Sequence, residues 1–573
     1  MPDGQTRTDL LTVGLEDYYH VGAFNRLIRL GQWSRFESRL EHGTRRTLAL
    51  LDEFGCQATF FVLGWVADHF PELVREVADR GHEIGSKGYY HRDIRGLTPV
   101  EFRADVVKAR EALEAATGRR VLGYRVADGW FGPDDIWRLD VLADEGHLYD
   151  SSATPLLGSF RQEPWRRYPY HHVAASGAAI WEFPVSTVSV LGYRLPIGGN
   201  ALRQLPAWWT RAIVNRWHQQ RRGPFLTYFH TWELDRQQPR ITAASSLSRL
   251  RHYRNLDHME RTLRALMGRC QFGPVAGYLG LPVLPSQPRA TGGSASGLEP
   301  PSGRGSAGVV RGVPNGSTQS VAVVVPCYNE QDSLPFVRNT IRSVEAAVRD
   351  RYQLEWVFVD DGSRDDTWAV LSRLFSGEPR VHLVRHSQNQ GLTAAILTGA
   401  RATSLDVVAT IDCDCSYDPH ELEHMLPRLV AGVDVVTASP YHPDGRVENV
   451  SRWRLVLSQT VSRLYRLVSR QKLATYTSCF RVYRRQTLLA ATARRGGFLG
   501  MAELLAAIDR NGGVIVEHPA TLTVRVLGHS SLRVVRSVLG HLGLLAELAV
   551  RRIVPASRPG LERPRGVSDA SHR

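Results

Sequence analysis

Three apolar runs in the C-terminal half of the chain are each followed by acidic residues. Glu330 follows VAVVVPCYN, the pair Asp360-Asp361 ends EWVFVDD, and Asp412 and Asp414 form a D-x-D pair after VVATI. Carboxylates this close together at the end of a buried strand repel one another and lose hydration, unless a cation lies between them. A hard divalent ion relieves that cost and can also neutralise the diphosphate of a departing nucleotide. One D-x-D pair alone is typical of a helix cap or turn, but three successive acidic ends favour a nucleotide-sugar site.

In the N-terminal half, polar residues also follow several of the apolar runs. Glu16 and Asp17 follow the first apolar run, His91 and Arg125 follow later ones, and His230 ends FLTYF. One such histidine alone is typical of a structural role, but carboxylate and imidazole groups at successive strand ends indicate a metal site. Zinc held by such ligands activates water against an amide carbonyl.

Both halves alternate short apolar runs with stretches of helical periodicity, which predicts α/β domains with mostly parallel strands. In such sheets ligands bind beyond the carboxyl ends of the strands, where both polar sets fall. Between the halves the sequence becomes rich in Gly, Pro and Ser, which is typical of a flexible linker. We predict a domain over 8–283, a linker over 284–319, a second domain over 320–530, and an amphipathic helix with a basic tail over 531–573.

Length and composition exclude several classes of protein. A chain of 573 residues is too long for one domain, and its composition is that of a globular protein. The net charge of +14 favours anionic partners, but the arginines are scattered and no nucleic-acid-binding motif is present, so we expect no nucleic acid. The six cysteines form no CxxC pair. Without an apolar run of membrane-spanning length or a signal peptide, we expect a cytoplasmic protein that is peripheral to the inner face of a membrane.

The segment from Val321 to about Arg525 resembles the family-two glycosyltransferases of the GT-A fold, nearest the dolichol- and polyprenol-phosphate sugar transferases. The resemblance implies that Asp412 and Asp414 hold a nucleotide diphosphate through Mg²⁺ or Mn²⁺. It places the nucleotide sugar against Pro326, Tyr328, Glu330, Asp360, Asp361, Gly391 and Asp412. Ser439-Pro440-Tyr441 departs from the family's Ser-Arg-Tyr, and Cys479 replaces a glycine, so the acceptor stays open.

Two kinds of acceptor are compatible with the sequence. The Gln-x-x-Arg-Trp motif of processive synthases is missing, which favours transfer of a single sugar. A polyprenyl phosphate is already an anion and needs only arginines to hold it, with Arg481 and Arg525 as candidates. A glycan hydroxyl needs a general base, for which Glu503 is the candidate. The helical pattern over 531–553 fits an interfacial helix on an anionic membrane or a packed helix that covers the sheet.

The N-terminal half resembles the polysaccharide deacetylases over about residues 10–278. Gly14-Leu-Glu-Asp-Tyr-Tyr-His stands where the nearest subgroup has Asp-Val-Glu-Asp-Tyr-Phe-His, and Lys87 stands where a metal-binding histidine belongs. The resemblance implies a distorted (β/α) barrel with a site at Glu16, Asp17, Lys87, His91, Arg125 and His230. A lysine ammonium has no lone pair for a metal. Near Glu16 or Asp17 it would instead neutralise the carboxylate and take the place of the metal. We therefore expect a degenerate accessory domain that binds zinc poorly.

Together these observations predict a glycosyltransferase of the GT-A fold behind a deacetylase-like barrel. It would move one sugar from a nucleotide sugar to a polyprenyl phosphate or glycan. One alternative is a bifunctional enzyme whose N-terminal domain is an active, zinc-dependent deacetylase. The other is a non-catalytic glycan-binding protein, which the intact acidic pairs argue against.

Overall fold

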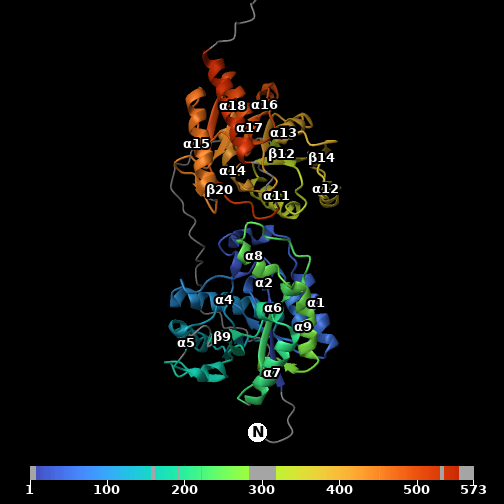
Figure 1. The fold of residues 1–573 in the computed structure, drawn as a ribbon, viewed down its shortest axis with the longest axis vertical. Helices are drawn as coiled ribbons and strands as arrows, with labels where there is room; N and C mark the ends of the chain where they lie inside the picture. The colour runs from blue at the N-terminus through green and yellow to red at the C-terminus, as the bar shows by residue number, and fades with distance from the viewer. Residues whose placement is uncertain are drawn as a thin grey trace, which may run out of the picture. The chain divides into compact units, whose positions relative to one another are not determined.

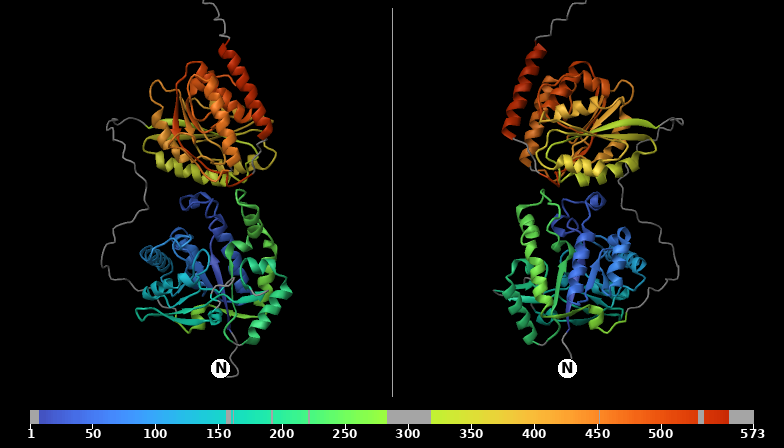
Figure 2. Two further views of the ribbon diagram at one scale, coloured as in Figure 1. Left: turned by 60° about the vertical axis from the view of Figure 1, so that its left-hand side comes forward. Right: turned by 90° about the vertical axis from the view of Figure 1, so that its right-hand side faces the viewer.

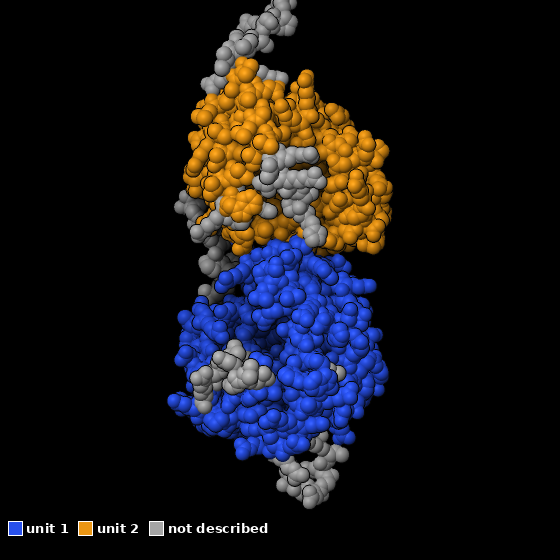
Figure 3. Space-filling model, viewed as in Figure 1, with its two compact units in different colours: residues 1–313 blue, residues 314–573 orange. Residues whose placement is uncertain are grey.

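The computed structural model describes residues 8–155, 160, 162–190, 193–220, 222–282, 318–450, 452–528 and 534–553. Two compact units divide the chain, residues 1–313 and 314–573 (Figure 3), here called the N-terminal and C-terminal units. The border between them falls within the predicted linker. The linker up to residue 317 and the predicted basic tail after residue 553 lie outside the described residues.

The described part of the N-terminal unit holds a nine-stranded sheet of order β10-β1-β2-β3-β4-β5-β7-β6, with β11 also paired to β1. The strands are β1 (Thr8–Leu15), β2 (Thr59–Val62), β3 (Glu83–Ser86), β4 (Gly123–Tyr124), β5 (Tyr149–Asp150), β6 (Tyr170–Val173), β7 (Ala179–Glu182), β10 (Leu226–His230) and β11 (Gln271–Gly273), and a separate hairpin pairs β8 (Thr187–Val190) with β9 (Tyr193–Pro196). The helices are α1 (Leu40–Glu53), α2 (Gly64–His69), α3 (Pro71–Asp79), α4 (Pro99–Thr117), α5 (Trp137–Asp144), α6 (Asn200–Gln204), α7 (Ala207–Gln220), α8 (Ser246–Tyr253), α9 (Leu256–Met267) and α10 (Val275–Tyr278) (Figure 1).

The sheet of the N-terminal unit curls toward a barrel. Its strands pair in parallel except for β6, which runs antiparallel to β7. After β7 the chain reaches the opposite edge, where the Ser186 amide donates to the Leu226 carbonyl in β10 at 3.0 Å. β1 is buried along all but its first residue, which is typical of a strand covered on both faces. The predicted α/β barrel with mostly parallel strands is confirmed.

The C-terminal unit has a seven-stranded sheet of order β14-β13-β12-β15-β18-β16-β19 in its described part. The strands are β12 (Gln319–Cys327), β13 (Tyr352–Asp360), β14 (Val381–Arg385), β15 (Val407–Thr410), β16 (Val435–Ser439), β18 (Arg481–Arg484) and β19 (Ile515–Pro519), with β17 (Arg446–Val447) and β20 (Thr521–Leu522) forming a separate pair. The helices are α11 (Leu334–Val348), α12 (Thr367–Phe375), α13 (Leu392–Arg401), α14 (Leu422–Met425), α15 (Arg452–Val468), α16 (Arg485–Ala490), α17 (Gly497–Arg510) and α18 (Val534–Ile553). β18 alone runs antiparallel to its neighbours in this sheet.

Helices cover both faces of this second sheet (Figure 2). Alternate residues of β12 face opposite layers: Val323 packs in the cluster formed with α11 and α12, and Val324 in the cluster formed with α13, α15, α17 and α18. α13 lies close to the sheet, because a Cβ at Gly399 would come within 2.4 Å of Val324 Cγ1. The result is a three-layer α/β/α unit with one shared edge of strand ends. In the described part of the chain, no helix combines the length and the apolarity needed to cross a bilayer.

Candidate functional sites

Four charged side chains of the C-terminal unit meet where β12 and β15 end. Glu330 lies in the loop after β12, and Asp412 and Asp414 lie in the loop after β15. Arg525, from the irregular stretch after β20, places Nε 2.6 Å from Asp414 Oδ2 and Nη2 2.9 Å from Glu330 Oε1. The loops come together because β12 and β15 are parallel neighbours. We call these four residues the acidic cluster.

The carboxylates of the acidic cluster outnumber its single guanidinium. Desolvation, followed by the charge of Asp414, raises the pKa of Asp412 to about 7. Desolvation raises the pKa of Glu330 to about 7 as well, although Arg525 acts against it. Burial alone would lower the pKa of Arg525, but Asp414 and Glu330 hold it above its usual range. This set of oxygen donors with unmet negative charge fits a hard divalent cation.

Asp360 and Asp361 lie one strand away, at the end of β13, and Asp361 holds the neighbouring loop. Asp361 accepts from the amides of Gln390 and Gly391, both at 2.8 Å, and contacts His386 Nδ1 at 2.7 Å. Gly391 has φ +95°, a conformation that favours glycine, and it caps the start of α13. Asp361 therefore fixes the loop that opens α13.

The loop after β12 is tied down in a similar way. Pro326 is buried in the last residues of β12, and Tyr328 is half-buried just beyond them. The Glu330 amide donates to Thr367 Oγ1 at 2.8 Å, and its Oε2 accepts from Ser333 Oγ at 3.0 Å. Those bonds orient the Glu330 carboxylate toward Arg525.

A largely apolar cavity of about 320 Å³ opens beside Asp412, Asp414 and Arg525. Its apolar lining comes from α15, from the first turn of α17, from β20 and from α18, which packs against α15 and α17 (Figure 1). The apolar lining residues include Trp453, Leu457, Val461, Phe498, Leu522 and Val538. We call this space the apolar cavity. The sequence signals this cavity weakly, because its lining residues are spread over helices, a strand and loops between residues 412 and 541.

Two of the predicted catalytic residues lie away from the apolar cavity. Arg481 is fully buried and donates to the carbonyls of Tyr476 and Met501 at 2.7 and 3.0 Å. Glu503 accepts from the amides of Arg494 and Arg495 at 2.9 and 2.8 Å. Both side chains thus hold backbone segments in place, and the arginine that reaches the cavity is Arg525. Catalytic roles for Arg481 and Glu503 remain predictions that this geometry does not favour.

Glu16 is the centre of the site in the N-terminal unit. The Lys87 ammonium contacts its Oε2, His91 Nε2 lies 3.5 Å from the same oxygen, and His230 Nδ1 lies 2.7 Å from Oε1. Burial would raise the pKa of Glu16, but Lys87, His230 and His91 hold it well below its usual value. Burial also lowers the pKa of His91 to about 4, so its imidazole is neutral at pH 7. Glu16 is an ionised carboxylate whose partner is already present.

Asp17 does not share that partner. Its Oδ2 accepts from Ser38 Oγ at 2.9 Å and from the Arg39 amide at 2.8 Å, and its Oδ1 accepts from the Tyr18 amide. Burial raises the pKa of Asp17 to about 7. The sequence left open which carboxylate Lys87 would neutralise, and the structure places Lys87 on Glu16.

Arg125 and His230 line a cavity of about 160 Å³, and Lys87 and Tyr228 also lie in its wall. Arg125 also lines it and donates to Thr12 Oγ1 at 2.7 Å and to Ser151 Oγ at 2.6 Å. Burial lowers the pKa of Arg125 to about 10, which still leaves it charged at neutral pH.

The residues around Glu16 do not fit a catalytic zinc. Lys87 stands where the deacetylase motif has a ligand, and its ammonium contacts the carboxylate that zinc would need. Sequence reasoning missed His20, which is fully buried beside Trp33 and Trp65 and whose Nδ1 lies 3.0 Å from the Asp17 amide. Its place in Glu-Asp-Tyr-Tyr-His could have signalled a role in orienting this loop.

Three sequence-family models match this chain, one in the C-terminal unit and two in the N-terminal unit. The sequence model described as "Glycosyl transferase family 2" matches residues 322–489. The model described as "Polysaccharide deacetylase" matches 33–139, and one described as "Domain of unknown function (DUF3473)" matches 151–280.

Individual proteins and solved structures are similar to parts of this chain. A polyprenol monophosphomannose synthase of Mycolicibacterium smegmatis is 33% identical over 223 residues, which are 38% of this chain and 82% of that protein. An undecaprenyl-phosphate mannosyltransferase of Micrococcus luteus is 28% identical over 37% of this chain and 87% of its own. A crystal structure of a putative polysaccharide deacetylase from Mycobacterium smegmatis covers 51% of this chain and 97% of its own, with 20% identity and a TM-score of 0.31.

The C-terminal sheet with its acidic strand ends is that of a GT-A nucleotide-sugar transferase, and a deacetylase-type unit precedes it. The chain belongs to glycosyltransferase family 2.

Proposed function

We propose that the C-terminal unit transfers a single sugar from a nucleotide sugar to a polyprenyl phosphate at a membrane surface. The observation that carries this proposal is the position of the apolar cavity, which shares Asp412, Asp414 and Arg525 with the acidic cluster. A lipid-linked acceptor needs an apolar space that ends at the reacting phosphate, and this cavity offers both parts. The mannosyl transfer to polyprenol carriers in the names of two relatives agrees with it.

The donor side of the site rests on the acidic cluster. Asp412 and Asp414 would hold Mg²⁺ or Mn²⁺, which when bound supplies positive charge to the departing nucleotide diphosphate. The raised pKa of Asp412 reflects the repulsion that such an ion would relieve. Asp361 keeps the loop before α13 in place on the nucleotide side.

The acceptor side favours a phosphate over a hydroxyl. A sugar hydroxyl must lose its proton to a base, but the carboxylates that line the cavity are Asp412 and Asp414, which the donor requires. Glu503 is engaged with the backbone of Arg494 and Arg495. A polyprenyl phosphate needs no base, and Arg525, which lines the cavity, would bind its oxygens.

The outer surface of α18 fits a bilayer interface. Leu539, Leu542 and Val550 are exposed and recur at helical spacing, while Leu544 and Leu545 pack into the unit. Trp453, at the start of α15 and in the cavity wall, is exposed as well. An apolar stripe beside the cavity would let a lipid acceptor enter from the membrane.

The test is a transfer assay on the full-length protein in detergent, with labelled nucleotide sugars, Mn²⁺ and a polyprenyl phosphate. We expect label in the lipid product, and Leu457→Glu should raise the KM for the lipid phosphate at least about tenfold by placing a charge in the cavity. Val456→Glu is the matched control, because the neighbouring Val456 side chain faces solvent. Label found solely in hydroxyl-bearing glycans, or equal effects of the two variants, would contradict the proposal.

We also propose that the N-terminal unit is an accessory domain without hydrolytic activity. The contact of Lys87 with Glu16 carries this proposal, because an ammonium at that place repels a dication. Lys87→His should add one equivalent of bound zinc to the full-length protein, with Lys108→His as control on an exposed lysine. Release of acetate from chito-oligosaccharides by the unaltered protein would instead support the bifunctional enzyme.

A further inference from the structure

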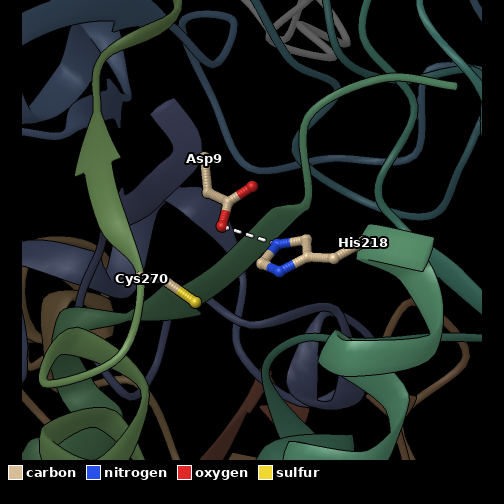
Figure 4. A group of neighbouring side chains, drawn as sticks. All are labelled: Asp9, His218 and Cys270. Carbon is tan, nitrogen blue, oxygen red and sulfur yellow. Dashed lines mark hydrogen bonds and ion pairs between the residues drawn. The ribbon is translucent and has the colours of Figure 1, made fainter. Parts of the chain in front are cut away.

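Three side chains from distant parts of the sequence meet at the amino end of β1. Asp9 is the second residue of β1, His218 lies in the last turn of α7, and Cys270 directly precedes β11, which pairs with β1. One ligand atom from each lies within 4.8 Å of the other two, and Figure 4 shows the carboxylate, imidazole and thiol turned toward a common space. His218 Nε2 is 2.9 Å from Asp9 Oδ2.

The chemistry of these three groups is that of a zinc site. Thiolate, imidazole and carboxylate are the ligands that zinc takes in proteins, at 2.0–2.3 Å. Zinc would require the atoms to move by about 1 Å or less, since ligands in a tetrahedral shell lie about 3.3–3.8 Å apart. One carboxylate and one thiolate together balance the charge of a divalent ion.

The surroundings orient the ligands and leave room for a fourth. Asp9 Oδ1 accepts from the Phe225 amide at 2.9 Å, which directs Oδ2 toward His218 and resembles the outer-sphere bonds of metal sites. Asp9 is 1% and Cys270 5% exposed. His218 and Cys270 border a cavity of about 150 Å³, which can hold a water as the fourth ligand. Arg211 and Arg269 line the same cavity, and their positive charges would repel a metal ion. The two anionic ligands, Asp9 and Cys270, offset that repulsion.

This position is separate from the deacetylase-type site. Glu16 follows the carboxyl end of β1, seven residues from Asp9, or about 23 Å at the usual rise of a strand. In (β/α) barrels the amino ends of the strands form the face devoted to stability. We propose that Asp9, His218 and Cys270 form a structural binding site for a zinc-class metal ion that joins β1, α7 and the segment before β11.

The test uses Co²⁺ as the probe on the full-length protein after treatment with a chelator. We expect one equivalent of Co²⁺ to give a thiolate-to-cobalt charge-transfer band in the near ultraviolet, and Zn²⁺ to displace it. Cys270→Ser should abolish the band. Cys56→Ser and Cys415→Ser, which remove thiols elsewhere, and His91→Asn, beside Glu16, should leave it unchanged.

Metal affinity and unfolding temperature test the site independently of the thiolate band, which Cys270→Ser would also lose if it failed to fold. His218→Asn keeps the thiol but should lower the affinity for Co²⁺ by more than about tenfold, since even outer-sphere changes cost that much. Zn²⁺ should raise the unfolding temperature of the unaltered protein and leave that of Cys270→Ser unchanged. Absence of the band in folded protein at excess Co²⁺, or its survival in Cys270→Ser, would overturn the proposal.

Discussion

Each unit carries a carboxylate site with one basic side chain inserted into it, yet the two sites are opposite in their electrostatics. In the N-terminal unit, Lys87 and two histidines surround the single carboxylate of Glu16, whose pKa is lowered. In the acidic cluster, Arg525 faces three carboxylates, and the pKa of Asp412 is raised. The two sites therefore differ in the ratio of carboxylates to cations and not in the presence of a basic residue, and this ratio underlies our proposals that the acidic cluster binds a metal ion and that the site around Glu16 does not.

The largest expected effect concerns the acidic cluster. Asp414→Asn should lower sugar transfer by about a thousandfold or more, because the charge that a metal supplies at a diphosphate is worth several kcal/mol. The measurement is the initial rate with saturating nucleotide sugar and Mn²⁺. Asp444→Asn is the control, since Asp444 is an exposed aspartate outside the cluster. An unchanged rate of sugar transfer in Asp414→Asn would show that the acidic cluster takes no part in the reaction.

Removal of each cation should separate the sites by stability. Lys87→Met should cost about 3 kcal/mol of unfolding free energy, because it leaves Glu16 buried without its main partner. Arg525→Met should cost less than about 1 kcal/mol, since the Arg525 side chain is 24% exposed against 2% for Lys87, and Glu330 can take up a proton. Urea unfolding followed by peptide-resolved hydrogen exchange reports each unit separately. Equal losses of unfolding free energy in the two units would show that the two basic residues have the same role in stability.

Neutralising one carboxylate at each site should change stability in opposite directions. The lowered pKa of Glu16 contributes stability above the unfolded value of about 4.3, and that stability is lost as pH falls through the folded pKa. The pKa of Asp412 is raised to about 7, so its contribution is present below about 3.9 and is lost as pH rises through 7. At pH 8, Glu16→Gln should therefore destabilise the N-terminal unit by about 1–2 kcal/mol, and Asp412→Asn should stabilise the C-terminal unit by a similar amount.

The same unfolding measurement, repeated between about pH 5 and pH 8, checks both signs. Variants are compared rather than whole units, because Asp17 gives the N-terminal unit its own loss of stability as pH rises through 7. At pH 5 the gain from Asp412→Asn should shrink, because the carboxyl is then protonated in the folded chain. A stabilising Glu16→Gln would show that Lys87 does not neutralise Glu16.

The smallest expected effect sharpens the contrast between the surroundings of the two sites. The cavity beside Glu16 has polar groups in its wall, whereas the acidic cluster opens into an apolar cavity next to the exposed stripe of α18. Leu539→Glu should reduce co-sedimentation with anionic vesicles severalfold, by placing a charge at the interface. Val100→Glu, at another exposed apolar position, in α4, is the control. Loss of binding in both variants, or in neither, would argue against α18 as the contact.

The acidic strand ends could be located from the sequence, whereas the apolar cavity beside them could not. The runs before Asp360 and Asp412 are continuous and apolar, as in strands buried on both faces, so their ends could be located from the pattern. In the N-terminal unit, β4 and β5 have only two residues each, too few for any periodicity to be visible. The pairings of Arg481 and Glu503 with backbone groups depend on tertiary contacts, which motif matching cannot distinguish from roles at a substrate.

Lys87 illustrates a further limit of prediction. The sequence identified it as the residue that replaces a ligand, because its type is wrong for the motif. The motif could not tell which carboxylate it neutralises, since Glu16 and Asp17 are neighbours in the chain. The Ser38 and Arg39 contacts settle the choice by occupying Asp17.

Gly14 leaves a space that the His230 side chain fills. A Cβ at this position would lie 2.3 Å from His230 Nδ1, so the imidazole occupies the space of the acid that the deacetylase motif has there. Restoring aspartate at position 14 would force His230 away from Glu16, with which it is in contact at 2.7 Å. Gly14→Asp would therefore disturb His230 and, through it, Glu16, the carboxylate that Lys87 contacts. A metal site around Glu16 would therefore need coordinated substitutions at positions 14 and 87, because a change at one of them alone leaves the other obstacle in place.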